Sequence, residues 1–155
     1  MKNILTAALF VCSIVLFSCA GNSEGKVSMS SAQISEQDAL FQSMMDVHDE
    51  VMPKLSEMSK LAQEIRTLIP NDAVDDDTKE QAYQIVHDLG VAEENMFGWM
   101  QEIKQPAALR DTASHEFIMS YYTAEKSKIE GVAKSINSGI AASVNFLNNY
   151  KGAEK

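Results

Sequence analysis

The chain has 155 residues, enough for one domain and a short leader, and 22 acidic against 13 basic residues give it a net charge of −9. This charge repels nucleic acid and anionic lipid head groups, so neither is expected as a partner. The two cysteines, Cys12 and Cys19, both lie near the N-terminus, so the remaining sequence has no disulfide framework, zinc ribbon or cysteine nucleophile.

Residues 1–18 are predicted to be a lipoprotein signal peptide. Lys2 precedes an apolar run over residues 4–17 that is too short for a stable transmembrane helix. The following "LFSC" resembles the bacterial lipobox, whose cysteine accepts the lipid; an ordinary secretory signal is the alternative. We therefore expect an exported protein, lipid-anchored through Cys19 to the outer membrane and facing the periplasm or the cell surface.

The mature chain is predicted to begin with a flexible tether over residues 19–34, because this stretch is small, polar and without period. A helical domain is expected over residues 35–150. Its first helix has Ser35 as a candidate N-cap, and apolar residues then recur at steps of three and four up to Ile69. His48 occupies one of these core-facing positions.

A second helix is predicted from an N-cap at Asp77 to Pro106, and a third begins near Asp111. The loops between the helices are short, which favours antiparallel neighbours. The sequence therefore predicts an all-α fold, an up-down-up bundle of three long antiparallel helices, completed where needed by dimerisation.

Soft side chains are expected to gather towards one end of this bundle. Folding the first helix onto the second sets His48 near Trp99 and Met100, and folding the second onto the third about residue 108 sets that level near Phe117. Imidazole and thioether ligands suit copper or another transition metal. The candidate ligands are Met44, His48, Met52, Met96, Met100, His115 and Met119.

The favoured interpretation of the same residues is structural, because methionine at helical spacing commonly fills a core. Pro53 removes an N–H from the helix and frees the carbonyl of Asp49, which is the expected partner of a buried His48. A second polar level is predicted where Glu93 and Glu125 meet near Tyr122. No cofactor is expected unless the metal hypothesis holds.

Other sites fit the sequence less well. The acids at residues 75–77 lack the alternating ligands and central glycine of a calcium loop, and they favour a helix start instead. The paired Glu-x-x-His motifs of di-iron bundles are absent, as is a G-x-S-x-G nucleophile elbow. Haem held by methionine and histidine is disfavoured. We therefore expect no enzyme.

The segments "MDVHDEVMPKLSEM" and "MFGWM" are similar to a group of small Bacteroidetes-type lipoproteins of unknown function, some labelled "viral A-type inclusion protein". The resemblance covers about the first two helices. It implies an envelope lipoprotein and no reaction. Together with the helical patterning, it favours a bundle that binds an unknown envelope protein or itself.

Overall fold

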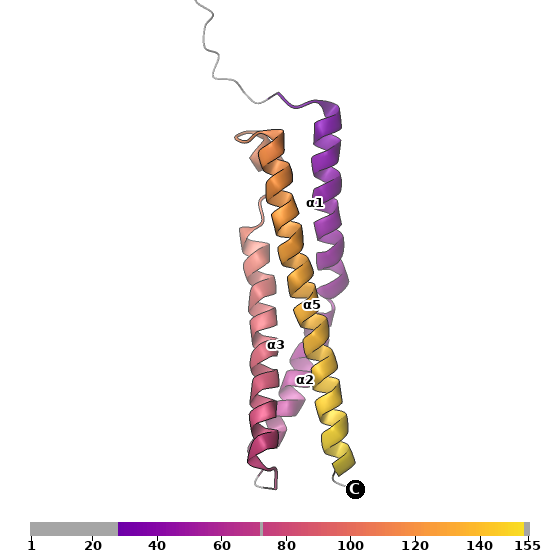
Figure 1. The fold of residues 1–155 in the computed structure, drawn as a ribbon, viewed down its shortest axis with the longest axis vertical. Coiled ribbons are helices and arrows are strands. Elements are labelled where there is room, and N and C mark those ends of the chain that lie inside the picture. The colour runs from indigo at the N-terminus through magenta and orange to yellow at the C-terminus, as the bar shows by residue number, and fades with distance from the viewer. Residues whose placement is uncertain (1–27, 72, 154–155) are drawn as a thin grey trace, which may run out of the picture.

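The computed structural model describes residues 28–71 and 73–153, which are all-helical and contain no strand. Packed helices run along the long axis of the molecule (Figure 1). They are α1 (Ser31–Val51), α2 (Lys54–Leu68), α3 (Asp76–Glu102), α4 (Pro106–Arg110) and α5 (His115–Ala153). The predicted signal peptide, most of the predicted tether and Cys19 lie outside the described residues. Within them, no helix is long and apolar enough to cross a membrane.

Two helices begin earlier than predicted because their caps lie earlier. The N-cap of α1 is Ser30, whose side chain accepts from the Gln33 N–H while the Gln33 side chain bonds back to the Ser30 backbone. Residues 31–34 are therefore helical rather than part of the tether. The N-cap of α3 is Asp75, not Asp77. Its carboxylate accepts from the hydroxyl and backbone N–H of Thr78, which lower the pKa of Asp75.

The predicted first helix is broken in two at Pro53. The last regular bond of α1 runs from the Met52 N–H to the His48 carbonyl at 2.9 Å, and Pro53 then offers no N–H to continue the ladder. After the break, α2 packs against both α3 and α5, whereas α1 packs against α5 and α4. The proline thus decides which helices are neighbours in each half of the molecule.

Polar contacts between helices show the direction of α1 and α2 relative to α5. The pairs are Gln37 with His115, Lys54 with Asn137, and Glu64 with Lys151. Residue numbers rise together in these pairs, so α1 and α2 run the same way as α5. The apolar side chains between the helices form one core, in which the largest fully buried hydrophobic side chains are Met44, Val51, Met58, Ile65, Leu89, Met96, Ile118, Tyr122, Ile129 and Ile136.

The pairing of α3 with α5 differs from the predicted alignment. A Cβ built on Gly139 would lie 2.7 Å from Leu89 Cδ2, so these two positions face each other. Their midpoint is residue 114 rather than the predicted 108. The reason is that residues 106–114 form a short helix and a turn instead of a plain loop. Trp99 therefore lies opposite a later part of α5 than Phe117, and that predicted proximity is wrong.

Candidate functional site

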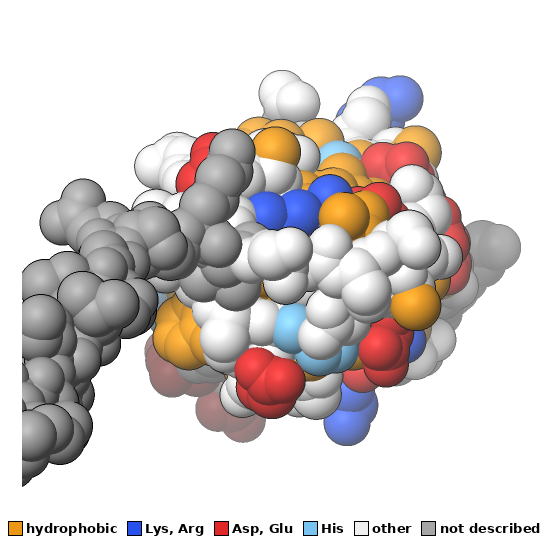
Figure 2. Space-filling model, turned by 90° about the horizontal axis from the view of Figure 1, so that it is seen from above, with side chains coloured by type: hydrophobic (Ala, Val, Ile, Leu, Met, Phe, Trp, Pro, Cys, Tyr) orange, Lys and Arg blue, Asp and Glu red, His pale blue; other side chains and the backbone are white. Residues whose placement is uncertain are grey.

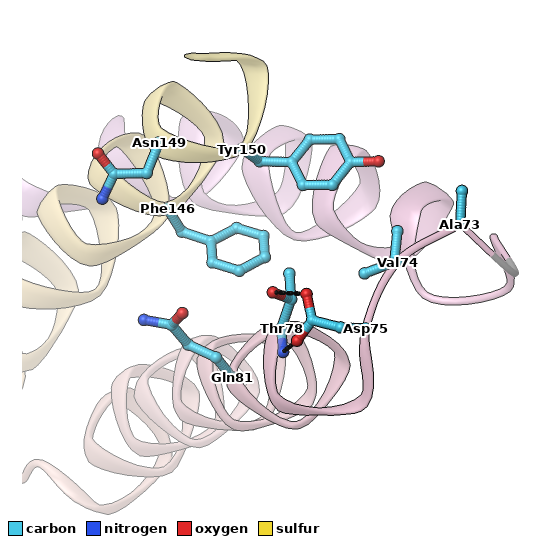
Figure 3. A pocket seen from close by; sticks show the side chains of 8 residues that line it. All are labelled: Ala73, Val74, Asp75, Thr78, Gln81, Phe146, Asn149 and Tyr150. Carbon is cyan, nitrogen blue, oxygen red and sulfur yellow. Dashed lines mark hydrogen bonds between the residues drawn. The ribbon is translucent and has the colours of Figure 1, made fainter. Parts of the chain in front are cut away.

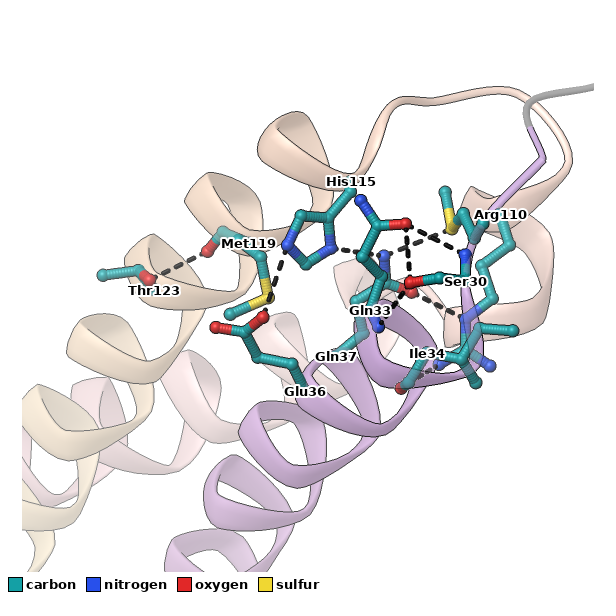
Figure 4. Close-up of polar contacts among 10 residues, drawn as sticks. Ser30, Gln33, Ile34, Glu36, Gln37, Arg110, His115, Met119 and Thr123 are labelled. Carbon is teal, nitrogen blue, oxygen red and sulfur yellow. Dashed lines mark hydrogen bonds and ion pairs between the residues drawn. The ribbon is translucent and has the colours of Figure 1, made fainter.

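A polar network joins α1, α4 and α5 at the end of the bundle where the described chain begins (Figure 4). Its centre is Gln37, which is 0% exposed. The Gln37 Oε1 accepts from Arg110 Nε at 2.7 Å, and the Gln37 Nε2 lies 3.1 Å from His115 Nδ1. Arg110 also donates to the Ile34 carbonyl at 3.1 Å and pairs with Asp38. One buried amide thus connects three helices.

The donors and acceptors of this network have a fixed order. Arginine can only donate, so Gln37 must present its oxygen to Arg110 and its NH₂ to His115. His115 then accepts at Nδ1 and carries its proton on Nε2, which lies 3.4 Å from Glu36 Oε2. Histidine and charged side chains reach the surface at this end (Figure 2), so the network is only partly enclosed. Gln37 and Arg110 were not among the residues predicted from the sequence.

His48 lies at the break between α1 and α2, on the side that faces α3. Its ring centroid is 5.9 Å from that of Trp99, and its side chain is 13% exposed. The predicted proximity of His48 to Trp99 is confirmed. The partner of Nδ1 is the carboxylate of Asp49, at 2.8 Å, so the prediction that the Asp49 carbonyl would be the partner is wrong. Nε2 is buried and makes no hydrogen bond with a described residue.

Two further buried polar atoms belong to α3 and α5. The Trp99 Nε1 has no hydrogen-bond partner among the described residues, and neither has Glu125 Oε2. The other oxygen of Glu125 accepts from Lys128 at 2.6 Å, which raises the pKa of the Lys128 ammonium. Lys128 and Trp99 line the same shallow depression. Trp99 therefore lies between the His48 ring on α1 and the Glu125–Lys128 pair on α5.

The predicted gathering of seven soft ligands is not found. His115 is adjacent to Gln37, and His48 lies eleven residues further along α1, a rise of roughly 16 Å. Of the methionines, Met44 and Met96 are in the core, Met52 and Met119 are half-buried, and Met100 is 40% exposed. The two imidazoles thus belong to different layers of the bundle. The prediction brought them together because it aligned α3 with α5 about residue 108.

The second predicted polar level is also wrong. Glu125 pairs with Lys128, while Glu93 lines a small cavity of about 70 Å³ between α3 and α2. Tyr122 bonds neither of them: its hydroxyl donates to the Lys104 carbonyl at 3.0 Å. Burial, with a smaller contribution from the neighbouring Tyr121, raises the pKa of Tyr122 to about 12. These residues are structural members of two separate layers.

A pocket of about 360 Å³ lies at the opposite end of the molecule, between the α2–α3 turn, α3 and α5 (Figure 3). Phe146 forms its apolar wall, and Gln81 and Asn149 carry amides around it. Asp75 and Thr78 also line it, but their mutual hydrogen bonds are those of the α3 cap. The chemistry of the cap therefore accounts for the most polar part of this pocket.

An exposed apolar surface lies between α1 and α3, and we call it the α1–α3 face. On α3 it comprises Phe97 and Met100, which are 43% and 40% exposed. Gly90 and Glu93 lie seven residues earlier on α3 and line a cavity with α2. Residues seven apart share one flank of a helix, so Phe97 and Met100 continue the flank of α3 that α2 covers nearer the start of that helix. On the other side it is continued by Met45 of α1 and by Met52, the C-cap residue of α1, which are partly buried and pack against the core.

The charge of the molecule is unevenly divided among the helices. α1 carries five carboxylates and no lysine or arginine, and α3 carries seven carboxylates and one lysine. In contrast, α2 has three basic and two acidic residues, and α5 has four basic and three acidic. The two helices that border the α1–α3 face therefore account for most of the net negative charge.

No family model, curated protein or solved structure matches this chain. Within residues 28–71 and 73–153, no group of three or more histidine, cysteine or acidic side chains is placed to hold a metal ion. The exposed large apolar side chains among the described residues are Tyr83, Val91, Phe97, Met100, Phe117 and Val144. Phe97 and Met100 lie one turn apart on the same flank of α3, and the α1–α3 face to which they belong is the candidate functional site.

Proposed function

We propose that this protein is a non-enzymatic lipoprotein of the cell envelope, anchored through lipid on Cys19, whose helical bundle binds another protein or a second copy. The observation that carries the proposal is the α1–α3 face. Large apolar side chains such as Phe97 and Met100 are 43% and 40% exposed beside each other on one helix flank. Adjacent exposed apolar residues of this kind favour an interaction surface.

In the proposed arrangement α1 and α2 count as one long helix, so that three long helices run up, down and up. A helix from outside this chain would pack beside α1 and α3. The tethered end supports the orientation: the described chain enters at the Ser30 cap, next to the Arg110 network. The face would then stand above the membrane in the periplasm or at the surface. The acidic surface supports a protein partner over nucleic acid.

The test is site-specific photocrosslinking in cells that make the full chain. A photoreactive residue replaces Phe97 or Met100, and the matched control position is Asn145, which is exposed on α5. We expect discrete crosslinked products from the two face positions and none from Asn145. Equal products from all three positions, or none from any, would contradict the proposed function.

The anchor is tested separately by Cys19→Ser. The proposal expects the wild type to take up radiolabelled palmitate and to fractionate with membranes, whereas the variant is unlabelled and soluble. A wild-type chain without acyl label would remove the anchor from the proposal and leave the interaction surface to be judged by crosslinking.

A further inference from the structure

We propose that the α1–α3 face receives a basic amphipathic helix from another protein, which lies between α1 and α3 as a fourth helix. The inference rests on the proposed function and names the chemistry of the partner. Three observations carry it: a missing helix neighbour, an apolar flank on each side of the gap, and the segregation of negative charge onto α1 and α3.

The missing neighbour follows from the break at Pro53. Below the break, α2 packs against α3, but above it α1 packs against α5 and α4 instead. The upper half of α3 therefore has α5 on one flank and no extensive helix contact on the other. Four-helix arrangements place each helix against two neighbours, and a helix between α1 and α3 would supply the absent contacts.

The two flanks of the face suit a helix with an apolar stripe. Met45 on α1 and Met52 at its C-cap are two turns apart and partly exposed, whereas Phe97 and Met100 are one turn apart on α3 and are 43% and 40% exposed. Methionine is flexible and polarisable, so it adapts to varied side chains on an incoming helix. An amphipathic helix recognises such a surface through apolar anchors spaced three and four residues apart.

Charge selects among possible helices. Asp49 follows Met45 by four residues on the same flank of α1, and Glu93 precedes Phe97 by four on α3. α1 carries five carboxylates, of which Asp38 and Glu50 pair with Arg110 and Lys54 of other helices, and α3 carries seven carboxylates against one lysine. Both helices that border the face therefore carry an excess of acid. Lysine or arginine beside the apolar stripe would complement them, and a second copy would bring the same acidic helices and be repelled.

The experiment uses the acylated full-length mature protein in nanodiscs of zwitterionic lipid, so that the probe has no anionic membrane to bind. The probe is a synthetic helix of about 18 residues, made of leucine and lysine with leucine at three- and four-residue spacing. One control peptide replaces every lysine with glutamate. Another keeps the composition but scrambles the order, which removes the apolar stripe. Calorimetric titration gives each affinity at low and raised salt.

We expect the leucine–lysine helix to bind at least about tenfold more tightly than either control, and its binding to weaken as salt rises. Phe97→Asp should weaken binding by about tenfold or more. The matched control is Tyr83→Asp, since Tyr83 is a 58% exposed aromatic residue on the half of α3 that α2 covers. Tyr83→Asp should leave binding within about twofold of the wild type. Glu93→Gln and Asp49→Asn should also weaken binding of the leucine–lysine helix, although they change no apolar anchor. These two variants test the inference if Phe97→Asp misfolds.

Equal affinities for the lysine, glutamate and scrambled peptides would overturn the inference, as would equal losses in Phe97→Asp and Tyr83→Asp. If photocrosslinking from Phe97 yields a heteromeric product while no basic helix binds, the inference is wrong and the proposed function stands. A crosslinked product of twice the chain mass would instead identify a second copy and also overturn the inference. Absence of crosslinks from the face contradicts the proposed function itself.

Discussion

Gln37→Leu is the substitution that tests most directly how the end of the bundle where α1 begins is held together. Leucine is close to glutamine in size, so packing changes little while every hydrogen bond of the side chain is lost. The Arg110 Nε then has no acceptor at this position, and His115 Nδ1 loses its donor at 3.1 Å. Arg110 keeps its bonds to the Ile34 carbonyl and to Asp38.

The expected loss can be worked from these contacts. Losing a hydrogen bond to a charged donor costs about 1.5–3 kcal/mol, and losing a neutral one costs about 0.5–1.5 kcal/mol. Arg110 and His115 are 21% and 17% exposed, so water relieves part of this cost, and buried leucine adds some apolar stabilisation. We expect a net destabilisation of about 2 kcal/mol, which corresponds to a melting temperature lower by about 4–8 °C in a domain of this size.

The assay is urea and thermal unfolding of the full chain, followed by circular dichroism. Gln42→Leu is the matched control, since Gln42 is exposed on the same helix and makes one bond, to Asp46. We expect it to change stability by no more than about 0.5 kcal/mol. If the two variants unfold together, the Gln37 network does not stabilise the bundle and the reasoning fails. Adding Arg110→Met to Gln37→Leu should cost less than the separate effects combined.

The remaining predictions concern helix packing, titration and metal binding. Gly131→Ala should stabilise the protein by about 0.5–1 kcal/mol, because an added Cβ meets no atom within 4 Å. In Gly139→Ala the added Cβ would clash with the Leu89 side chain, so the same gain should be lost. A higher urea midpoint for Gly131→Ala than for Gly139→Ala would support this reasoning, and equal gains would contradict it. Because burial raises the pKa of Tyr122 to about 12, its contribution to stability is complete below the ordinary tyrosine pKa and is lost as the pH rises towards 12. Tyr122→Phe should therefore reduce the alkaline loss of stability in a pH series of unfolding curves, and an unchanged profile would refute it. His48→Ala should shift the emission of Trp99, the only tryptophan, to longer wavelength, and an unshifted spectrum would contradict the ring contact. Since the imidazoles lie in separate layers, Cu(I) or Zn²⁺ should leave the melting temperatures of wild type and His48→Ala unchanged; a rise confined to the wild type would restore the metal hypothesis.

The helical class was predictable because it depends on local pattern. Apolar residues at steps of three and four bury one stripe of each helix, and this period identified most of the core, including Met44, Met58, Met96 and Ile129. Helix starts were less accurate. Ser30 and Asp75 are caps of the same chemical type as the predicted Ser35 and Asp77, and several such residues stand close together in the sequence.

The candidate site was predictable only in part. The proximity of His48 to Trp99 followed from folding two helices about a short turn, and the turn is short in the structure as well. The alignment of α5 with α3 did not follow from the sequence, because residues 106–114 form a short helix and a turn instead of a plain loop. The midpoint of the α3–α5 pairing lies six residues later than predicted, so each residue of α3 faces an α5 residue twelve positions later. His115 is therefore not level with His48.

The sequence by itself determined the helices, their apolar stripes and the excess of acid, since each depends on residue type and spacing along the chain. Tertiary structure decided what those stripes meet. The break at Pro53 turns α2 towards α3 and leaves α1 on α5, so Phe97 and Met100 are exposed although they continue a flank that is covered lower down. Likewise, Gln37 and Arg110 become partners only because α4 folds back over the start of α1. Contacts between distant residues depend on register and direction, which helical periodicity does not specify.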